Sequence, residues 1–327
     1  MKDARDKMTE IAGLVLPFFG LIFLGYLTAR FVHHPGEAMG WLNTFIIYLA
    51  LPALFFKLVS RTPIEQLARA DFILTTVGAT YIVFSLIFLV GVYVRRNSIA
   101  EATIQGFGAA YGNIGYMGPG LALLALGDAA AVPVALIFSF ENAAHFAVAP
   151  AMMAISGGRQ EKPLALAASV ARKIILHPFI LATLAGVVAA FFAVQPPVPV
   201  QRLIDYLAQC AAPCALFAMG VTLALRPIKR IPVEIGYIVP AKLLLHPLVM
   251  FTAMSLTGNY DPVWVQTAVL LAALPTATNV FVIGHQYGVW QERASATILI
   301  TTTLSVATVT GLLYLIRSGA LPPDLFP

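Results

Sequence analysis

The chain contains few charged residues and few cysteines. Lysine, arginine, aspartate and glutamate make up 11% of its 327 residues, and the only cysteines are Cys210 and Cys214. No Gly-x-x-x-x-Gly-Lys-Ser/Thr phosphate loop is present, which argues against direct use of ATP. No histidine or cysteine pair has metal-ligand spacing, and Ser139 with His145 is not a convincing nucleophile and base. We therefore expect no enzyme, no metal site and no cofactor.

Hydrophobic residues, by contrast, make up 59% of the chain, and the mean hydropathy is +0.85. A soluble protein of this composition could not cover its surface with polar groups. The net charge of +5 is small and scattered over the loops, which indicates membrane topology and no nucleic-acid partner. Cys210 and Cys214 would share one face of an apolar helix, where we expect buried thiols. The sequence therefore predicts an integral protein of the lipid bilayer.

A helix that crosses a ~30 Å hydrocarbon core needs about 20 apolar residues. Ten runs meet this length, and the linkers between them are too short for a soluble domain. The first run lacks a small-residue cleavage site, so it is not predicted to be a cleaved signal peptide. The runs cover residues 9–31, 39–58, 72–94, 99–126, 131–155, 170–194, 200–225, 232–256, 262–288 and 294–316.

Positive charges are divided unequally between the two sides that ten spans would create. The loops after the odd-numbered spans hold eleven lysines and arginines, whereas the other side holds seven. The positive-inside rule therefore places the odd loops in the cytoplasm and both termini outside.

Two apolar strings recur at a fixed offset of 161 residues. Residues 17–25 resemble residues 178–186, and residues 52–56 fall on residues 213–217. Five spans repeated in opposite orientation are a plan of secondary transporters. The expected division is a first five-helix repeat at 1–155, a cytoplasmic linker at 156–169 and a second five-helix repeat at 170–327.

Glycine, proline and asparagine interrupt two of the predicted spans in their middles. Residues 111–120 read Tyr-Gly-Asn-Ile-Gly-Tyr-Met-Gly-Pro-Gly, and residues 274–281 read Leu-Pro-Thr-Ala-Thr-Asn-Val-Phe. Within a membrane such breaks survive only where the freed backbone groups are buried in protein or line a watery cavity. Paired interruptions in two halves of a membrane protein indicate the substrate site of a transporter.

These two strings resemble the auxin efflux carrier family, which includes plant PIN-FORMED auxin carriers and bacterial permeases for malonate, malate and similar acids. The resemblance covers essentially the whole chain, down to residues 298–305. It implies an all-α fold of ten transmembrane helices in two inverted repeats, similar to bile-acid and sodium/proton transporters, with helices 4 and 9 broken and crossing. It also implies a scaffold of helices 1, 2, 6 and 7 that forms a homodimer, a mobile domain of helices 3–5 and 8–10, and a bacterial inner-membrane location.

We therefore expect a secondary carrier of small organic anions, either auxin-like or malate- and malonate-like acids, that works by elevator-type alternating access. The alternatives are an anion channel and a membrane receptor or sensor of organic acids. Half-helix ends carry partial positive charge, so a carboxylate would bind at the crossing, with Asn113 as its principal donor. The asparagines could instead only cap the breaks. The expected site residues are Gly112, Asn113, Gly115, Tyr116, Pro275, Thr276 and Asn279, with Leu51, Pro52 and Phe217 as an apolar wall that would suit an aromatic acid.

Four ionisable residues in or near the spans are candidates for coupling or support. Glu141 and His145 lie four residues apart and could carry a proton, or could hold helices in register. Lys242 could neutralise the anion, pair with Glu141 or Asp71, or snorkel to water. In plant relatives a lysine follows the equivalent of Asp71 by four residues, but Thr75 stands there in this chain, so Asp71 could be an ordinary helix-start charge. Coupling to H⁺ or Na⁺ would be needed only for uptake.

Overall fold

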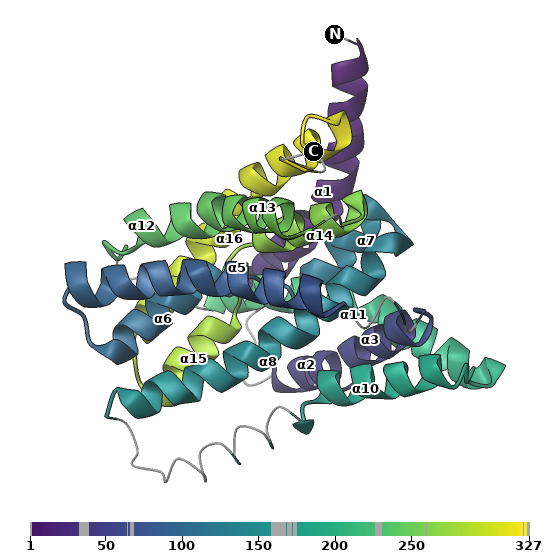
Figure 1. Ribbon diagram of the computed structural model, residues 1–327, viewed down its shortest axis with the longest axis horizontal. Helices are drawn as coiled ribbons and strands as arrows, with labels where there is room; N and C mark the ends of the chain where they lie inside the picture. The colour runs from purple at the N-terminus through teal and green to yellow at the C-terminus, as the bar shows by residue number, and fades with distance from the viewer. Residues whose placement is uncertain are drawn as a thin grey trace.

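A computed structural model of the chain describes residues 2–32, 39–63, 65, 69–157, 168, 172, 175–225, 231–258, 260–322, 324 and 325, and most of these are helical (Figure 1). The predicted linker at 156–169 and the start of the sixth run lie largely outside the described residues. The beginning of α1 and the end of α16 lie at the same end of the molecule (Figure 1). That both termini face outward stays a prediction.

The helices fall on the predicted runs. Those before residue 158 are α1 (Lys2–Phe31), α2 (Met39–Phe45), η2 (Ile46–Ala50), α3 (Leu51–Ser60), α5 (Ala70–Leu89), η3 (Val90–Val94), α6 (Ile99–Ala110), α7 (Gly118–Leu126), η4 (Asp128–Ala130) and α8 (Ala131–Ile155). Those that follow are α10 (Pro178–Phe191), α11 (Val198–Leu225), α12 (Ile235–Pro240), η5 (Ala241–Leu245), α13 (His246–Thr257), α14 (Pro262–Ala272), α15 (Asn279–Tyr287) and α16 (Gln291–Ser318). The elements η2, η3 and η5 are π-helical turns within longer helices.

Within the described residues, six helical segments are long and apolar enough to cross a membrane. They are Met39–Ser60, Ala70–Val94, Asp128–Ile155, Val198–Leu225, Ile235–Thr257 and Gln291–Ser318. The other predicted runs contain the shorter apolar helices Val15–Phe31, Pro178–Phe191 and Pro262–Ala272, or are divided by a break.

Local sequence explains where the broken helices begin and end. Ser98 caps α6, because its hydroxyl oxygen accepts the Glu101 N–H at 3.2 Å while the Glu101 side chain returns to the Ser98 N–H. Asp261 caps α14 by a single bond, in which its side-chain oxygen accepts the Val263 N–H at 2.8 Å, and Pro262 is the first helical residue. Both predicted interruptions are present, since α6 stops before Tyr111 and α14 stops before Ala273.

Two helix pairs pack closely outside the broken segments. Helix α1 packs along α11, and α3 packs along α10, which lies beside it in Figure 1. Gly25 and Gly220 allow α1 and α11 to approach backbone to backbone, because a Cβ at either position would collide with main-chain atoms of the other helix. Cys210 and Cys214 are free thiols on α11, but both are half-buried, so the prediction of buried thiols is wrong.

Candidate functional site

The two breaks contact each other through main-chain hydrogen bonds. The Asn113 N–H donates to the Pro275 carbonyl oxygen at 2.8 Å, and the Ala277 N–H donates to the Tyr111 carbonyl oxygen at 2.9 Å. Between these bonds, Gly112 pairs with Thr276 in an antiparallel bridge. Backbone groups freed by one break are thereby satisfied by the other, as a site inside a bilayer requires.

Hydrogen bonds of Thr276 tie the second break to α6 and to α16. Its hydroxyl donates to the Gly108 carbonyl oxygen of α6 at 2.6 Å, and its N–H donates to the Thr301 hydroxyl of α16 at 3.2 Å. Thr276 is fully buried, and neither it nor Pro275 lines the neighbouring cavity. The structure therefore gives both residues a part in building the crossing, while the expected contact of Thr276 with a carboxylate stays a prediction.

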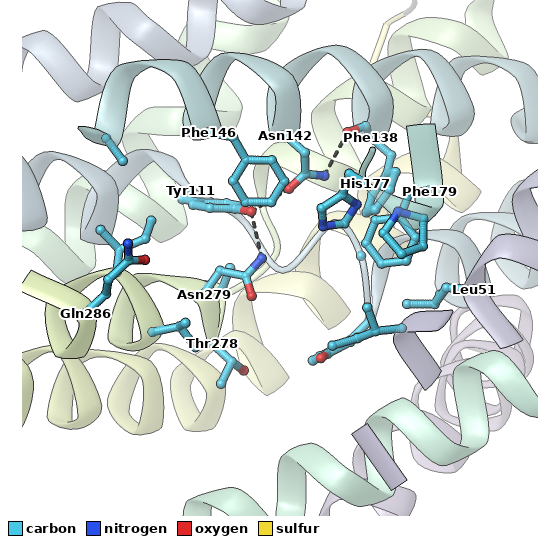
Figure 2. A pocket seen from close by; sticks show the side chains of 18 of the residues that line it. Leu51, Tyr111, Phe138, Asn142, Phe146, His177, Phe179, Thr278, Asn279 and Gln286 are labelled. Atoms are coloured by element: carbon cyan, nitrogen blue, oxygen red, sulfur yellow. Dashed lines mark hydrogen bonds between the residues drawn. The ribbon is translucent and has the colours of Figure 1, made fainter. Parts of the chain in front are cut away.

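A cavity of about 960 Å³ lies against the crossing. This volume is at the upper end of the usual range for ligand sites. Six of the expected site residues line it: Leu51, Gly112, Asn113, Gly115, Tyr116 and Asn279. Four aromatic side chains line part of the cavity: Phe138, Phe146, His177 and Phe179 (Figure 2). Pro52 and Phe217 are not among the lining residues, so the structure does not bring these two predicted positions to the cavity.

Tyr111 connects the polar groups of the cavity. Its hydroxyl donates to the Asn142 side-chain oxygen and accepts a 2.7 Å hydrogen bond from the Asn279 side-chain amide (Figure 2). The Asn142 amide in turn donates to the Phe138 carbonyl oxygen at 2.7 Å. Tyr111 and Asn142 were not predicted as site residues, although each is a polar side chain within an apolar run. The exposed cation Arg172, near the start of the sixth predicted run, also lines the cavity and was not predicted as a site residue.

Asn113 is 3% exposed and faces two other segments. Its side-chain amide donates to the sulfur of Met219 on α11 at 3.1 Å. Its side-chain oxygen accepts the Tyr116 N–H at 3.4 Å, a long bond at the start of the turn into α7. Asn113, which was predicted as the principal donor to the cargo, therefore lies at the crossing. In the structure its amide donates to the thioether sulfur of Met219.

Lys242 is fully buried, so the expectation that it could snorkel to water is wrong. Its ammonium group donates to the Ala272 carbonyl oxygen at 2.6 Å and lies 2.9 Å from His246 Nδ1. The other ring nitrogen of His246 lies 3.1 Å from the Thr80 hydroxyl, which donates to a Glu141 carboxylate oxygen at 2.9 Å. A relay of side chains thus links the buried ammonium and the buried carboxylate without direct contact. We call Lys242, His246, Thr80 and Glu141 the buried relay.

His145 is also fully buried, but it bonds to a different partner from Glu141. Its Nδ1 lies 3.0 Å from the Tyr81 hydroxyl, and its ring centroid lies 4.0 Å from that of Tyr111. Glu141 bonds to Thr80, the neighbour of Tyr81 on α5. The two predicted coupling residues therefore hold α8 against α5 separately.

Asp71 does not take part in the buried relay. Its carboxylate forms an ion pair with Arg69 at 2.8 Å, at the exposed start of α5. The Arg69 guanidinium also lies over the ring of Trp264, and its hydrogen bond with Asp71 raises the pKa of this arginine. Thr75, which stands where plant relatives have a lysine, bonds to the Thr257 hydroxyl at 3.0 Å. The predicted alternative of a pair between Lys242 and Asp71 is wrong, because each has another partner.

Comparison with known proteins agrees with these features. A model of the family described as "Membrane transport protein" matches residues 11–313. The chain is 80% identical over 320 residues to a Rhizobium meliloti (strain 1021) protein named "Putative malonate transporter", covering 98% of this chain and 100% of that protein. It is 26% identical over 317 residues to the "Uncharacterized transporter YfdV" of Escherichia coli (strain K12), covering 95% of this chain and 99% of that protein.

Proposed function

Because the chain belongs to the membrane transport protein family, the auxin efflux carriers, we propose that it is a secondary carrier of small dicarboxylates across the inner membrane. The observation that carries the proposal is the bonded crossing of two broken helices against a cavity of about 960 Å³. Crossed broken helices place ligand-binding groups at the middle of a membrane, where alternating-access carriers hold their cargo.

The groups around the cavity suit an anion. The starts of α7 and α15 carry partial positive charge, and their first N–H groups, such as those of Gly118 and Val280, donate to carbonyl oxygens of the preceding turns. Asn113 lies on one break and Asn279 on the other, so amide groups are available on both sides of the crossing. A diacid with a short spacer could contact both. The name of the Rhizobium meliloti relative supports malonate as the first cargo to test.

Reciprocal packing supports the inverted repeat. A Cβ on Gly25 would collide with the Phe217 carbonyl oxygen, and a Cβ on Gly186 would come within 3.3 Å of the Phe56 carbonyl oxygen. Gly186 is the equivalent of Gly25 at the offset of 161, and Phe217 is the equivalent of Phe56. Such an exchange of partners is expected when two halves are related by a twofold axis. In the proposed elevator, α1 to α3, α10 and α11 form the stationary, dimerising scaffold, and the other helices move.

Proton coupling is proposed to pass through the buried relay. Thr80 donates to Glu141, so it must accept from the His246 Nε2–H, which leaves Nδ1 to accept from Lys242. The relay is therefore ordered from ammonium to carboxylate. Export down the membrane potential would need no such coupling, since each negative charge gains about 2.3 kcal/mol per 100 mV. Uptake of an anion against that potential would need this proton coupling.

The test is charge movement by purified protein in proteoliposomes on a solid-supported membrane. Malonate, malate, succinate and indole acetate would be applied to the native protein, Asn113→Ala, Asn279→Ala and the control Gln209→Ala, whose amide is exposed on α11. We expect saturable malonate currents that both cavity variants reduce at least about tenfold and the control does not. Equal currents in all four proteins would remove the proposed site, and no response of the native protein to any acid would remove the proposed cargo class.

A further inference from the structure

The contact between Asn113 and Met219 joins the crossing to α11. Met219 is 2% exposed, and its sulfur accepts the Asn113 side-chain amide at 3.1 Å. Met219 directly precedes Gly220, where α11 approaches α1 so closely that a Cβ would meet the Ile22 carbonyl oxygen. The sulfur is therefore attached to a part of α11 that is packed backbone to backbone against another helix.

The chemistry of this hydrogen bond is unusual for a buried amide. A thioether is a weak acceptor, whereas a carboxylate forms short, charge-assisted hydrogen bonds. The main chain of Asn113 is fixed independently of its side chain, by the 2.8 Å bond to Pro275 and by the Met117 N–H that donates to its carbonyl oxygen at 3.1 Å. Exchanging the acceptor of the side-chain amide would thus leave the backbone of the crossing unchanged.

We propose that the Met219 sulfur is a releasable latch, which holds the Asn113 amide while the carrier is empty and is displaced by a carboxylate of the cargo. This inference rests on the proposed function and adds a residue on α11 to the site. Loading would break the described side-chain link between the crossing and α11. The empty carrier would keep that link, so its crossing would move less readily than that of the loaded carrier.

Such a latch also selects the cargo. An occupant gains from the exchange only when it offers a better acceptor than a thioether, and a carboxylate does so more strongly than a neutral carbonyl group. The neutral diamide of malonic acid should therefore compete poorly with malonate, although the two molecules have nearly the same size and shape.

The test uses Met219→Leu, which removes the acceptor at nearly constant volume, and Met219→Gln, which provides a stronger acceptor. Met250→Leu on α13 is the matched control, because Met250 is 1% exposed. Malonate exchange, with cargo on both sides, and net malonate flux, which requires return of the empty carrier, are measured in proteoliposomes. Melting temperatures in detergent report whether each variant is folded.

We expect Met219→Leu to lower the malonate KM about three- to tenfold and to bring the ratio of exchange to net flux toward one. Met219→Gln should raise the malonate KM and the ratio of exchange to net flux, and Met250→Leu should change neither. A higher KM in Met219→Leu with an unchanged ratio would overturn the latch, because that is the behaviour of a sulfur that only orients the amide. Native transport with no effect of either substitution would overturn the latch alone. A native protein that moves no carboxylate would overturn the proposed function as well.

Discussion

The ammonium group of Lys242 donates a 2.6 Å hydrogen bond to the carbonyl oxygen of Ala272, the last residue of α14. The carbonyl end of a helix carries partial negative charge, so a buried cation there is favourable. Through His246 and Thr80 the same cation reaches the buried Glu141. Lys242 therefore stabilises two features: the end of α14, where the break before α15 begins, and the buried carboxylate of Glu141.

Replacing Lys242 by methionine should destabilise the protein strongly. The substitution keeps most of the apolar side chain but leaves the Ala272 carbonyl oxygen without its cation and Glu141 without the positive charge of the relay. A cost of about 3–5 kcal/mol is usual when one member of a buried charged pair is removed. The measurement is thermal unfolding in detergent. The double variant with Glu141→Gln should recover much of the loss, and additive losses would contradict the link between the two residues.

Glu141→Gln by itself separates cargo binding from proton movement. Glutamine keeps an oxygen that can accept the Thr80 hydroxyl bond, but it cannot take up a proton. We expect malonate binding to persist while proton flux, followed with a pH-sensitive dye inside the vesicles, is abolished. Glu101→Gln, on the partly exposed first turn of α6, serves as the control. An unchanged proton flux in Glu141→Gln would exclude the relay as the coupling route.

Tyr111→Phe tests the polar wall of the cavity. The lost hydroxyl leaves the Asn142 oxygen and the Asn279 amide without their shared partner, and Asn279 becomes free to rotate. We expect the KM for malonate to rise about three- to tenfold, with a loss of stability of about 1–3 kcal/mol. Tyr93→Phe, at an exposed tyrosine of η3, is the control. Native kinetics in Tyr111→Phe would show that the orientation of Asn279 does not matter to the cargo.

Gly220→Ala should force α1 and α11 apart. The added methyl group would meet the Ile22 carbonyl and the Tyr26 N–H, and main-chain atoms cannot move aside as a flexible side chain can. Overpacking of this kind costs about 1–3 kcal/mol. Gly311→Ala is the matched control, since nothing lies within 4 Å of its added Cβ and alanine favours the interior of α16. A melting temperature of Gly220→Ala equal to that of the control would refute the close approach.

The broken helices could be predicted from sequence, because glycine and proline leave a direct local signature at Gly112, Gly115 and Pro275. Their mutual contact was implied by the resemblance to the auxin efflux carriers, and it agrees with the rule that freed backbone groups must find partners. The places of Asn113 and Asn279 beside a cavity could be anticipated for the same reason.

The partners of the side chains could not be predicted, since they come from helices distant in the chain. Met219 lies 106 residues after the asparagine that it accepts from. For Lys242 the position in the run left several alternatives open, including snorkelling to water, because its acceptors at Ala272 and His246 depend on how α13 and α14 pack. Two predicted wall positions failed for the same reason: Pro52 and Phe217 are apolar and lie on α3 and α11, but they are not among the residues that line the cavity.

The bonds that join the two breaks use main-chain atoms, so exchanging side chains does not delete them. A proline at position 113 or 277 would, because it removes the donating N–H. Cargo preference can therefore change, in evolution or by design, through the lining residues Phe146, His177 or Phe179, while the main-chain bonds between the half-helices stay the same. A library of variants at these lining positions should yield many folded carriers with new substrates. In a library at residues 111–113 and 275–277, the number of folded variants should be limited mainly by the backbone conformation and the N–H groups that the crossing requires.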